Sequence, residues 1–238
     1  MSAGGLILEA PRLKDFSHEK IFGASPFLEE IKPLDRDISG LPLIFQGRVN
    51  SCVSCAITFI RQWQDKNKPD LSWEWLADIS NTKPSGATPS QCLEPARKTG
   101  ILPQGQWDSN LKDVDFEAAL NSAYEYRIGN YFYVRDLSKN GLYHAMKETP
   151  IAIGVRDWKG VGPHFMVAFD VTDDGQMLKC ANWWRDDMQD VQLVPFESVV
   201  VAVSFRELPE GFVKRDARLS AYTVLMDKMK YYLKYVLT

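Results

Sequence analysis

Two cysteines that stand three residues apart are the first candidates for chemistry in this chain. Cys52 and Cys55 lie in the segment FQGRVNSCVSCAITFIRQW, residues 45–63. Apolar residues follow them at helical spacing, so a mostly buried helix is predicted, with Ser51 as its cap and Cys52 in its first turn. A thiol in that turn lies near unsatisfied backbone N–H groups and the positive end of the helix dipole, which favour the thiolate. Cys52 is therefore a candidate nucleophile.

The same pair of cysteines also invites three other interpretations. A structural zinc site requires a second close pair of ligands, whereas Cys92 and Cys180 stand alone. The histidines are scattered along the chain at His18, His144 and His164. A redox pair follows the first strand of a βαβ unit, and here the strand-like segments come later. No metal is therefore expected, and Cys55, Cys92 and Cys180 are interpreted as small buried hydrophobic residues.

A thiolate nucleophile needs a base and a group that orients the base. His164 follows several glycines and opens a long apolar run, a position that suits either a cleft residue or a structural histidine. His18 and His144 lie in the N-terminal segment and in a predicted amphipathic helix, where packing or surface roles are expected. Asn182 ends the next predicted strand, MLKCAN. If these two strands pair across the turn near Asp174, His164 and Asn182 lie near the same end, and the amide can hold the imidazole.

Helix-like and strand-like segments divide the chain into two halves. Helical patterns occupy residues 71–80, 89–101 and 114–126. After residue 127 the chain changes to β-branched and aromatic runs, interrupted by one predicted helix, GLYHAMKE. These runs are YFYVR, IAIGVR, FMVAFDV, MLKCAN and SVVVAVSF. The order predicts an α+β fold with an N-terminal helical lobe, a C-terminal antiparallel β-sheet or barrel lobe, and a cleft between them.

Composition narrows the class of protein. The 238 residues are enough for one large domain or two packed lobes. With 28 basic and 31 acidic residues the net charge is -3, so no nucleic-acid partner is predicted. Four cysteines are too few for a secreted disulfide scaffold, and the N-terminus lacks the pattern of a signal peptide. No stretch reaches the roughly 18 apolar residues of a membrane span. A reducing compartment such as the cytoplasm is expected.

The two ends of the chain are predicted to lie outside the main domain. Prolines break any long helix in residues 1–34, which are expected to form an extended arm. Residues 208–238 are expected to form an amphipathic helix with a short heptad seam. The seam consists of Leu219, Tyr222, Met226, Met229, Leu233 and Val236. It suits self-association or a partner helix, folding back on its own domain, or binding to an anionic membrane surface.

Four parts of the sequence together resemble the papain-like cysteine peptidases. QGRVNSCVSCA is similar to the family's segment around the nucleophile, which implies Cys52 as the nucleophile and Gln46 as an oxyanion donor. His164 matches the family's base, and NWW resembles its Asn-Ser-Trp, which implies Asn182 as the orienting residue and Trp184 as its cover. The resemblance spans residues 35–207 and implies a two-lobe peptidase domain that acts on a peptide or protein substrate without a cofactor.

Several residues depart from the family's pattern. Asn50 replaces the usual glycine before Ser-Cys, Phe165 follows the histidine, and Trp183 and Arg185 flank the covering tryptophan. No inhibitory prodomain of the usual length is expected. In these features the sequence is more similar to the small bacterial and bacteriophage members of the family. Two alternatives therefore stay open: a catalytically weak or inactive subunit of a larger assembly such as a phage particle, with a virion location, and a cell-wall peptide hydrolase.

Overall fold

The computed structural model describes residues 5–9, 11, 17–23, 30–82, 85–107 and 116–207. Helices dominate the first part of this chain and strands the second, which confirms the predicted α+β two-lobe fold. The helices before the first strand are α1 (His18–Phe22), α2 (Cys52–Gln64), α3 (Trp73–Ile79), α4 (Pro89–Lys98) and α5 (Phe116–Tyr124). They are followed by β1 (Ile128–Tyr133), α6 (Lys139–Glu148), β2 (Ile151–Val155), β3 (His164–Val171), β4 (Met177–Asn182), β5 (Asp190–Pro195), a 3-10 turn (Phe196–Ser198) and β6 (Val199–Glu207).

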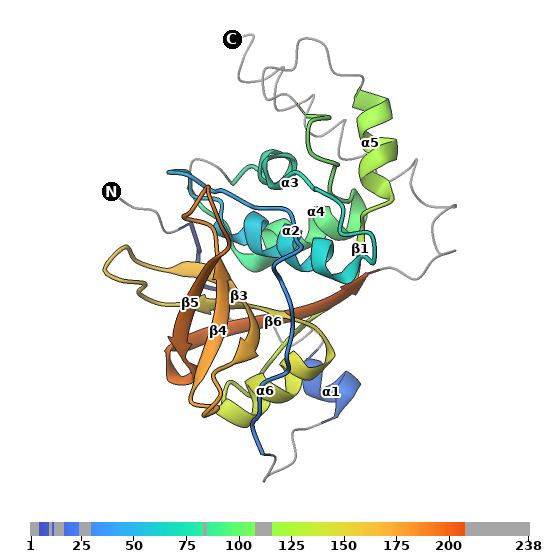
Figure 1. Ribbon diagram of the computed structural model, residues 1–238. Helices are drawn as coiled ribbons and strands as arrows, with labels where there is room; N and C mark the ends of the chain where they lie inside the picture. The colour runs from blue at the N-terminus through green and yellow to red at the C-terminus, as the bar shows by residue number, and fades with distance from the viewer. Residues whose placement is uncertain are drawn as a thin grey trace.

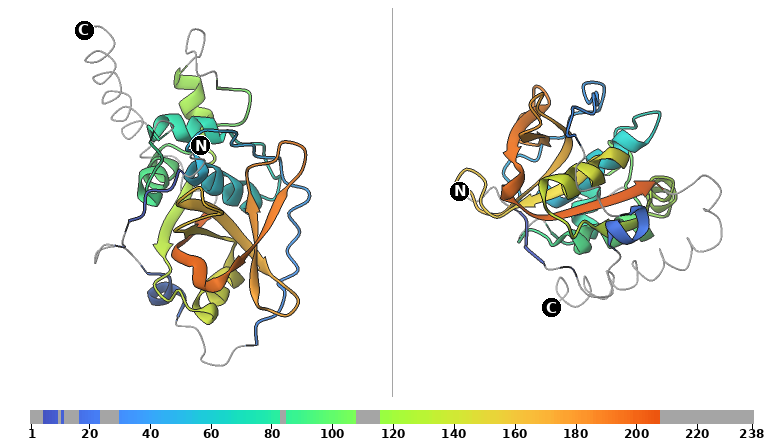
Figure 2. Two further views of the ribbon diagram at one scale, coloured as in Figure 1. Left: turned by 90° about the vertical axis from the view of Figure 1, so that its left-hand side faces the viewer. Right: turned by 90° about the horizontal axis from the view of Figure 1, so that it is seen from below.

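The strands form one antiparallel sheet in the order β1-β6-β2-β3-β4-β5. Helices α2, α3 and α4 lie together on one side of it, while α6 packs on the other side with α1 nearby (Figure 1). The views in Figure 2 show the same layering from two further directions. Residues 30–50 run from the α6 side up to the helical lobe, so the chain crosses the sheet before α2 begins.

Strand β3 is buried along its whole length because both of its faces are covered. Phe165, Val167 and Phe169 point into the core shared with α2, α3 and α4. Met166 and Ala168 point into the second core, beneath α6. Alternate side chains of the strand thus pack into two separate cores. Both faces must be apolar, which explains why FMVAFDV is a nearly continuous apolar run.

Helix α1 and strand β5 are not predicted from the sequence. Helix α1 lies within the segment expected to be an extended arm, where the Ser17 side chain accepts a hydrogen bond from the N–H of Lys20 and caps it. Strand β5 is the last strand on its side of the sheet that the described residues form. Val191 and Leu193 of this strand are exposed, whereas apolar residues of a strand usually face the core. The strand was therefore difficult to predict from the sequence.

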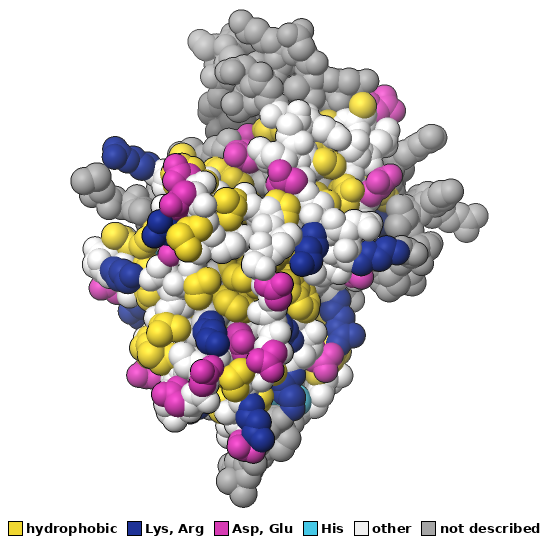
Figure 3. Space-filling model, viewed as in Figure 1, with side chains coloured by type: hydrophobic (Ala, Val, Ile, Leu, Met, Phe, Trp, Pro, Cys, Tyr) yellow, Lys and Arg dark blue, Asp and Glu magenta, His cyan; other side chains and the backbone are white. Residues whose placement is uncertain are grey.

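The predicted terminal helix with its seam, residues 208–238, lies outside the described residues. None of the helices in the described part is long and apolar enough to cross a membrane. On the face shown in Figure 3, basic and acidic side chains are interspersed rather than gathered by sign.

Candidate functional site

Helix α2 begins at Cys52, which places this thiol at the helix N-terminus. Ser51 occupies the cap position, although its side chain makes no capping hydrogen bond. The Cys52 side chain is completely buried, and backbone hydrogen bonds from Gly5 and Phe165 reach its sulfur. Phe165 directly follows His164, so the thiol lies against the first residues of β3. The helical lobe supplies the sulfur and the sheet lobe supplies the imidazole.

His164 and Asn182 meet at one end of the β3–β4 hairpin. His164 is the first residue of β3 and Asn182 the last of β4, and their side chains are both buried. The His164 Nε2 lies 2.7 Å from the Asn182 Oδ1. The Asn182 Nδ2 in turn donates a 2.9 Å hydrogen bond to the Oδ2 of Asp190, the first residue of β5. Three side chains from three adjacent strands therefore form one hydrogen-bonded row.

Two tryptophans enclose this row. The half-buried Trp184 ring lies 4.8 Å from the His164 ring, tilted by 34°. Trp183 is fully buried, packs against Phe59 of α2, and donates a 3.2 Å hydrogen bond from Nε1 to the Phe165 carbonyl. Trp184 shields the imidazole, whereas Trp183 joins the strand that carries Asn182 to the helix that carries Cys52.

Gln46 lies in the loop that precedes α2, and its side chain is buried. Its backbone N–H donates to the Trp183 carbonyl at 2.9 Å, which attaches the loop to the end of β4. Its side-chain Nε2 donates a 2.5 Å hydrogen bond to the carbonyl of Val49. This bond orients the amide of the Gln46 side chain within the loop.

The N-terminal segment, residues 5–9, covers Cys52. The Ala87 N–H donates to the Gly5 carbonyl, the Ile7 N–H donates to the Ala87 carbonyl, and both distances are 2.7 Å. Leu6 is only 5% exposed and belongs to the same core as α2. A Cβ atom at Gly5 would lie 2.3 Å from the backbone of Asn50, so only glycine can approach this closely. These contacts, with the hydrogen bond from Gly5, explain the complete burial of the thiol.

Glu9 anchors the far end of this covering segment. Its carboxylate accepts hydrogen bonds from the backbone N–H of Ser90 at 2.8 Å and from the Ser90 hydroxyl at 2.9 Å. It also accepts a 2.5 Å hydrogen bond from the hydroxyl of Tyr133. Ser90 belongs to α4 and Tyr133 to β1, so one carboxylate ties the segment to both lobes.

Burial opposes charge on both the thiol and the imidazole. It raises the pKa of Cys52 to about 12, against the opposing backbone hydrogen bonds. It lowers the pKa of His164 to about 4, although the hydrogen bond to Asn182 and the charge of Asp190 act in the other direction. The position at the helix N-terminus was expected to favour the thiolate, but removal from water outweighs the dipole while the segment is seated. The covered pair is therefore a neutral thiol and a neutral imidazole at neutral pH.

The remaining cysteines are placed as core residues. Cys55, Cys92 and Cys180 are free and completely buried. Burial raises the pKa of the Cys55 thiol well above its ordinary value, and the charges of Cys52 and Glu74 add to the effect. Among the described residues, no three histidine, cysteine or acidic side chains gather into a group that could hold a metal ion.

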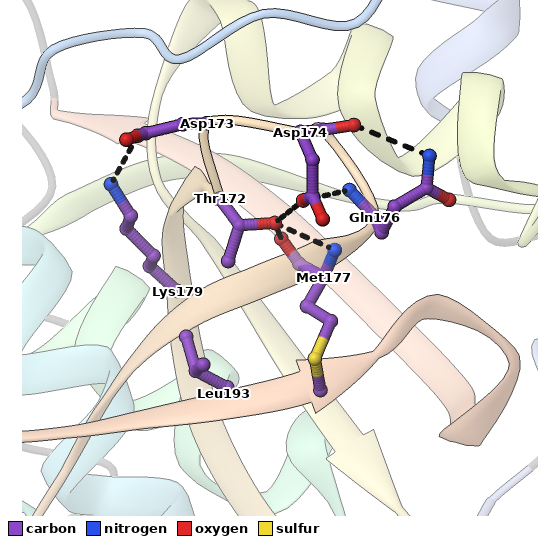
Figure 4. Close-up of a pocket in the computed structure, with 7 residues that line it drawn as sticks. All are labelled: Thr172, Asp173, Asp174, Gln176, Met177, Lys179 and Leu193. Carbon is purple, nitrogen blue, oxygen red and sulfur yellow. Dashed lines mark hydrogen bonds and ion pairs between the residues drawn. The ribbon is translucent and has the colours of Figure 1, made fainter.

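A surface hollow lies at the opposite end of the β3–β4 hairpin (Figure 4). It is lined by Thr172, Asp173, Asp174, Gln176, Met177, Lys179 and Leu193. The Thr172 hydroxyl donates to the Asp174 carboxylate at 2.6 Å, so the polar groups there close the turn. None of the residues that resemble the peptidase motifs lines this hollow.

Sequence reasoning missed two parts of the site, namely Asp190 and the covering segment. Asp190 follows the charged run Arg185–Asp187 and opens a strand that was not predicted. Alternation of Val191, Gln192 and Leu193 was the available signal. Gly5 and Leu6 carry no local signal, since their contacts are with Asn50 and Ala87, far along the chain.

Comparison with known proteins identifies the fold. No protein-family model matches the sequence, and a search of curated proteins finds no relative. Solved structures do match: xylellain, a cysteine protease from Xylella fastidiosa, has a TM-score of 0.68 at 16% identity, covering 87% of this chain and 97% of its own. Procathepsin L2 from the larval midgut of Tenebrio molitor gives 0.67 at 16% identity, covering 86% and 78%. Bromelain from Ananas comosus, solved with the inhibitor E64, gives 0.57 at 13% identity, covering 71% and 95%.

Proposed function

We propose that this chain, which has the papain-like fold, is a cysteine peptidase that hydrolyses peptide bonds through Cys52, His164 and Asn182. The observation that carries the proposal is the arrangement at the lobe boundary. A thiol at the N-terminus of α2 lies against the head of β3, and the imidazole there is held by an amide at 2.7 Å. A nucleophile, a base and a group that orients the base are the parts that covalent catalysis requires.

In the proposed mechanism, the covering segment first leaves the site. His164 then accepts the proton of Cys52, and the thiolate attacks the carbonyl carbon of the scissile peptide bond. The amide of Gln46 and the backbone N–H of Cys52 stabilise the resulting oxyanion. His164 protonates the leaving amine, which departs as the acyl-enzyme forms, and then activates the water that releases the acid. Asn182 keeps the ring aligned throughout, and Trp184 excludes water from their hydrogen bond.

The experiment that tests this function is covalent labelling with a peptidyl epoxide, a thiol-directed electrophile with a peptide-like body. The label is expected on Cys52, since Cys52 is the first residue of α2 and Cys55 lies one turn deeper, away from the helix N-terminus. Mass mapping of the adduct decides between them. The reaction is to be run on the wild-type chain and on Gly5→Ala, in which the covered state is expected to be less populated. Preferential labelling of Cys55, or none in either chain, contradicts the proposal.

Absence of labelling in both chains would favour the alternative of an inactive papain-like subunit in a larger assembly. The observation that favours this alternative is the complete burial of Cys52, because a buried thiol cannot reach a substrate. A cell-wall peptide substrate remains within the same chemistry, because the nucleophile, base and oxyanion donors act on any accessible amide carbonyl. Comparing hydrolysis of a protein substrate with that of peptidoglycan stem peptides separates these two substrate classes.

Replacement of Gln46 with alanine is expected to lower kcat by about 100-fold or more, because one oxyanion donor contributes on the order of 3 kcal/mol to the transition state. KM for a peptide substrate is expected to change little. The melting temperature serves as control, since Gln46 also donates to Val49. A kcat within twofold of the parent chain, at an unchanged melting temperature, would remove Gln46 from the oxyanion site.

A further inference from the structure

The geometry points to Asp190 as a positioning residue that sets the direction of the hydrogen bonds through Asn182 to His164. This inference rests on the proposed function, because it assigns a role toward the same reacting pair. Asp190 touches neither the thiol nor the imidazole. Its hydrogen-bonded link to His164 runs through the amide of Asn182, and its charge also favours the protonated imidazole.

The argument starts from what a carboxylate can do. An ionised carboxylate accepts hydrogen bonds and cannot donate, so the group of Asn182 that faces Asp190 must be its NH₂. That orientation turns the Asn182 Oδ1 toward His164, where it lies 2.7 Å from Nε2. A carbonyl oxygen only accepts, so Nε2 must carry the proton. Nδ1 of the neutral ring is left with its lone pair free to accept a proton.

The surroundings of the His164 ring agree with a proton on Nε2 and a lone pair on Nδ1. His164 Nδ1 is buried and has no hydrogen-bond partner among the described residues. The backbone of Phe165, the next residue, contacts the Cys52 sulfur. The unpartnered Nδ1 therefore belongs to the residue that directly precedes this contact. Without Asp190, the Asn182 amide could rotate by half a turn and present its NH₂ to the ring, which would favour the tautomer with the proton on Nδ1. That tautomer cannot accept a proton from Cys52.

Asp190 is itself held in place from its other side. Its Oδ2 accepts from Asn182, and its Oδ1 accepts a 2.5 Å hydrogen bond from the Nε2 of Gln192. The Gln192 Oε1 accepts in turn from the Lys159 ammonium at 2.7 Å. Asp190 is only 7% exposed and pairs directly with Asn182 in the β4–β5 register. Both carboxylate oxygens are thus occupied, which restricts the rotation of the group.

Several charged groups lie near this row and bear on how the protonation of His164 depends on pH. Asp190 favours the protonated imidazole of His164. Arg185, Asp186 and Asp187 lie on the loop between β4 and β5. The hydrogen bond and charge of Asp187, followed by the charges of Asp190 and Asp186, raise the pKa of the Arg185 guanidinium. Lys159 reaches the row from the β2–β3 loop through Gln192, and the Cys52 thiol lies against the backbone of Phe165, the residue after His164. Removal of the Asp190 charge alone therefore shifts the balance toward the neutral imidazole.

The test compares Asp190→Asn with Asp187→Asn in the full-length chain. Asp187 is an exposed acidic residue of the same loop, with 62% of its side chain accessible, so this control removes the same charge. Two measurements are needed: ¹⁵N chemical shifts of the His164 ring, which report the tautomer without any turnover, and the pH profile of kcat/KM. Asp190→Glu is the second variant, since it keeps the charge and serves if Asp190→Asn does not fold.

In the wild-type chain and in Asp187→Asn, the neutral His164 ring is expected to carry its proton on Nε2. In Asp190→Asn the ring is expected to show a mixture of tautomers, and kcat/KM is expected to fall about 10- to 100-fold, as when the outer hydrogen-bond partners of metal-bound histidines are removed. The alkaline limb of the profile is expected to move to lower pH, because the imidazolium loses a favourable charge. Asp190→Glu is expected to restore the Nε2 tautomer and part of the activity.

An unchanged tautomer and profile in Asp190→Asn would overturn the inference, even if the chain is an active peptidase. If Asp190→Asn does not fold, an Nδ1-protonated ring in the wild type or in Asp190→Glu has the same consequence. Failure of the proposed function looks different: the wild-type chain would show no turnover and no labelled Cys52, while the ring measurement would still report on Asp190.

Discussion

Replacement of Cys52 with serine is expected to lower kcat/KM for a peptide substrate by at least about 1,000-fold, since loss of the nucleophile in such a site removes covalent catalysis altogether. A serine hydroxyl is of similar size but a far weaker acid than a thiol, so the His164 imidazole cannot convert it into an anion at neutral pH. The fold is expected to persist, because the substitution exchanges one buried small side chain for another.

The matched control is Cys55→Ala, which alters the other cysteine of the pair. Cys55 is completely buried in the core on the same helix, so this change is expected to affect stability and leave kcat/KM within a few fold of the parent chain. Steady-state kinetics and thermal melts of both variants distinguish chemistry from stability. If Cys52→Ser keeps full activity while Cys55→Ala loses it, the nucleophile has been assigned to the wrong cysteine.

Substitution of Gly5 with alanine is expected to increase the rate at which iodoacetamide alkylates Cys52 by about 5- to 150-fold. The new Cβ would lie 2.3 Å from the carbonyl of Asn50, a backbone contact that neither side can avoid by rotating a side chain. Overpacking of this kind costs about 1–3 kcal/mol, and each 1.4 kcal/mol changes an equilibrium about tenfold. The penalty applies only while the segment is seated, so it shifts the population toward the uncovered site.

The gain in alkylation is expected to depend on pH. Only the thiolate reacts, and burial under the segment raises the Cys52 pKa from its ordinary value of 9.0 to about 12. Uncovering admits water and returns the pKa toward that ordinary value. The ratio between Gly5→Ala and the wild type should therefore be largest near neutral pH and should diminish as the pH approaches 12, where the covered thiol also ionises.

Gly40→Ala provides the control for the substitution itself. A Cβ at Gly40 would meet the side chain of Lys68, whose Nζ would lie 3.0 Å away at the far end of a flexible chain that can move aside. Alkylation in this variant is expected to match the wild type. Equal alkylation in all three chains would mean that residues 5–9 do not limit access to Cys52, and the burial of the thiol would need another cause.

The parts of the site that depend on local pattern could be predicted from the sequence. The start of α2 at Cys52 follows from a capping residue and an apolar helical run. The proximity of His164 and Asn182 follows from the pairing of two neighbouring strands across a short turn. Both arguments use residues that are close together along the chain, where periodicity and turn chemistry carry the information.

The parts that depend on long-range contact could not be predicted in this way. Asp190 opens a strand in which Val191 and Leu193 are exposed while Val194 is buried, so its apolar residues do not mark one buried face. The approach of Gly5 to Asn50 depends on how residues 5–9 fit between two lobes that are assembled from the rest of the chain. No spacing rule links these positions. The predicted low pKa of Cys52 was reversed for the same reason, because desolvation depends on what covers the thiol.

The burial of β3 between two cores has a consequence for mutational robustness. His164 is fixed at the head of a strand whose alternate residues belong to different hydrophobic clusters, one beneath α2 and one beneath α6. Close-packed interiors transmit displacement instead of absorbing it. A cavity opened in either cluster therefore acts on the same rigid strand and moves the same imidazole. Sequence drift in the α6 cluster, far from Cys52, is constrained by the alignment of His164 as well as by stability.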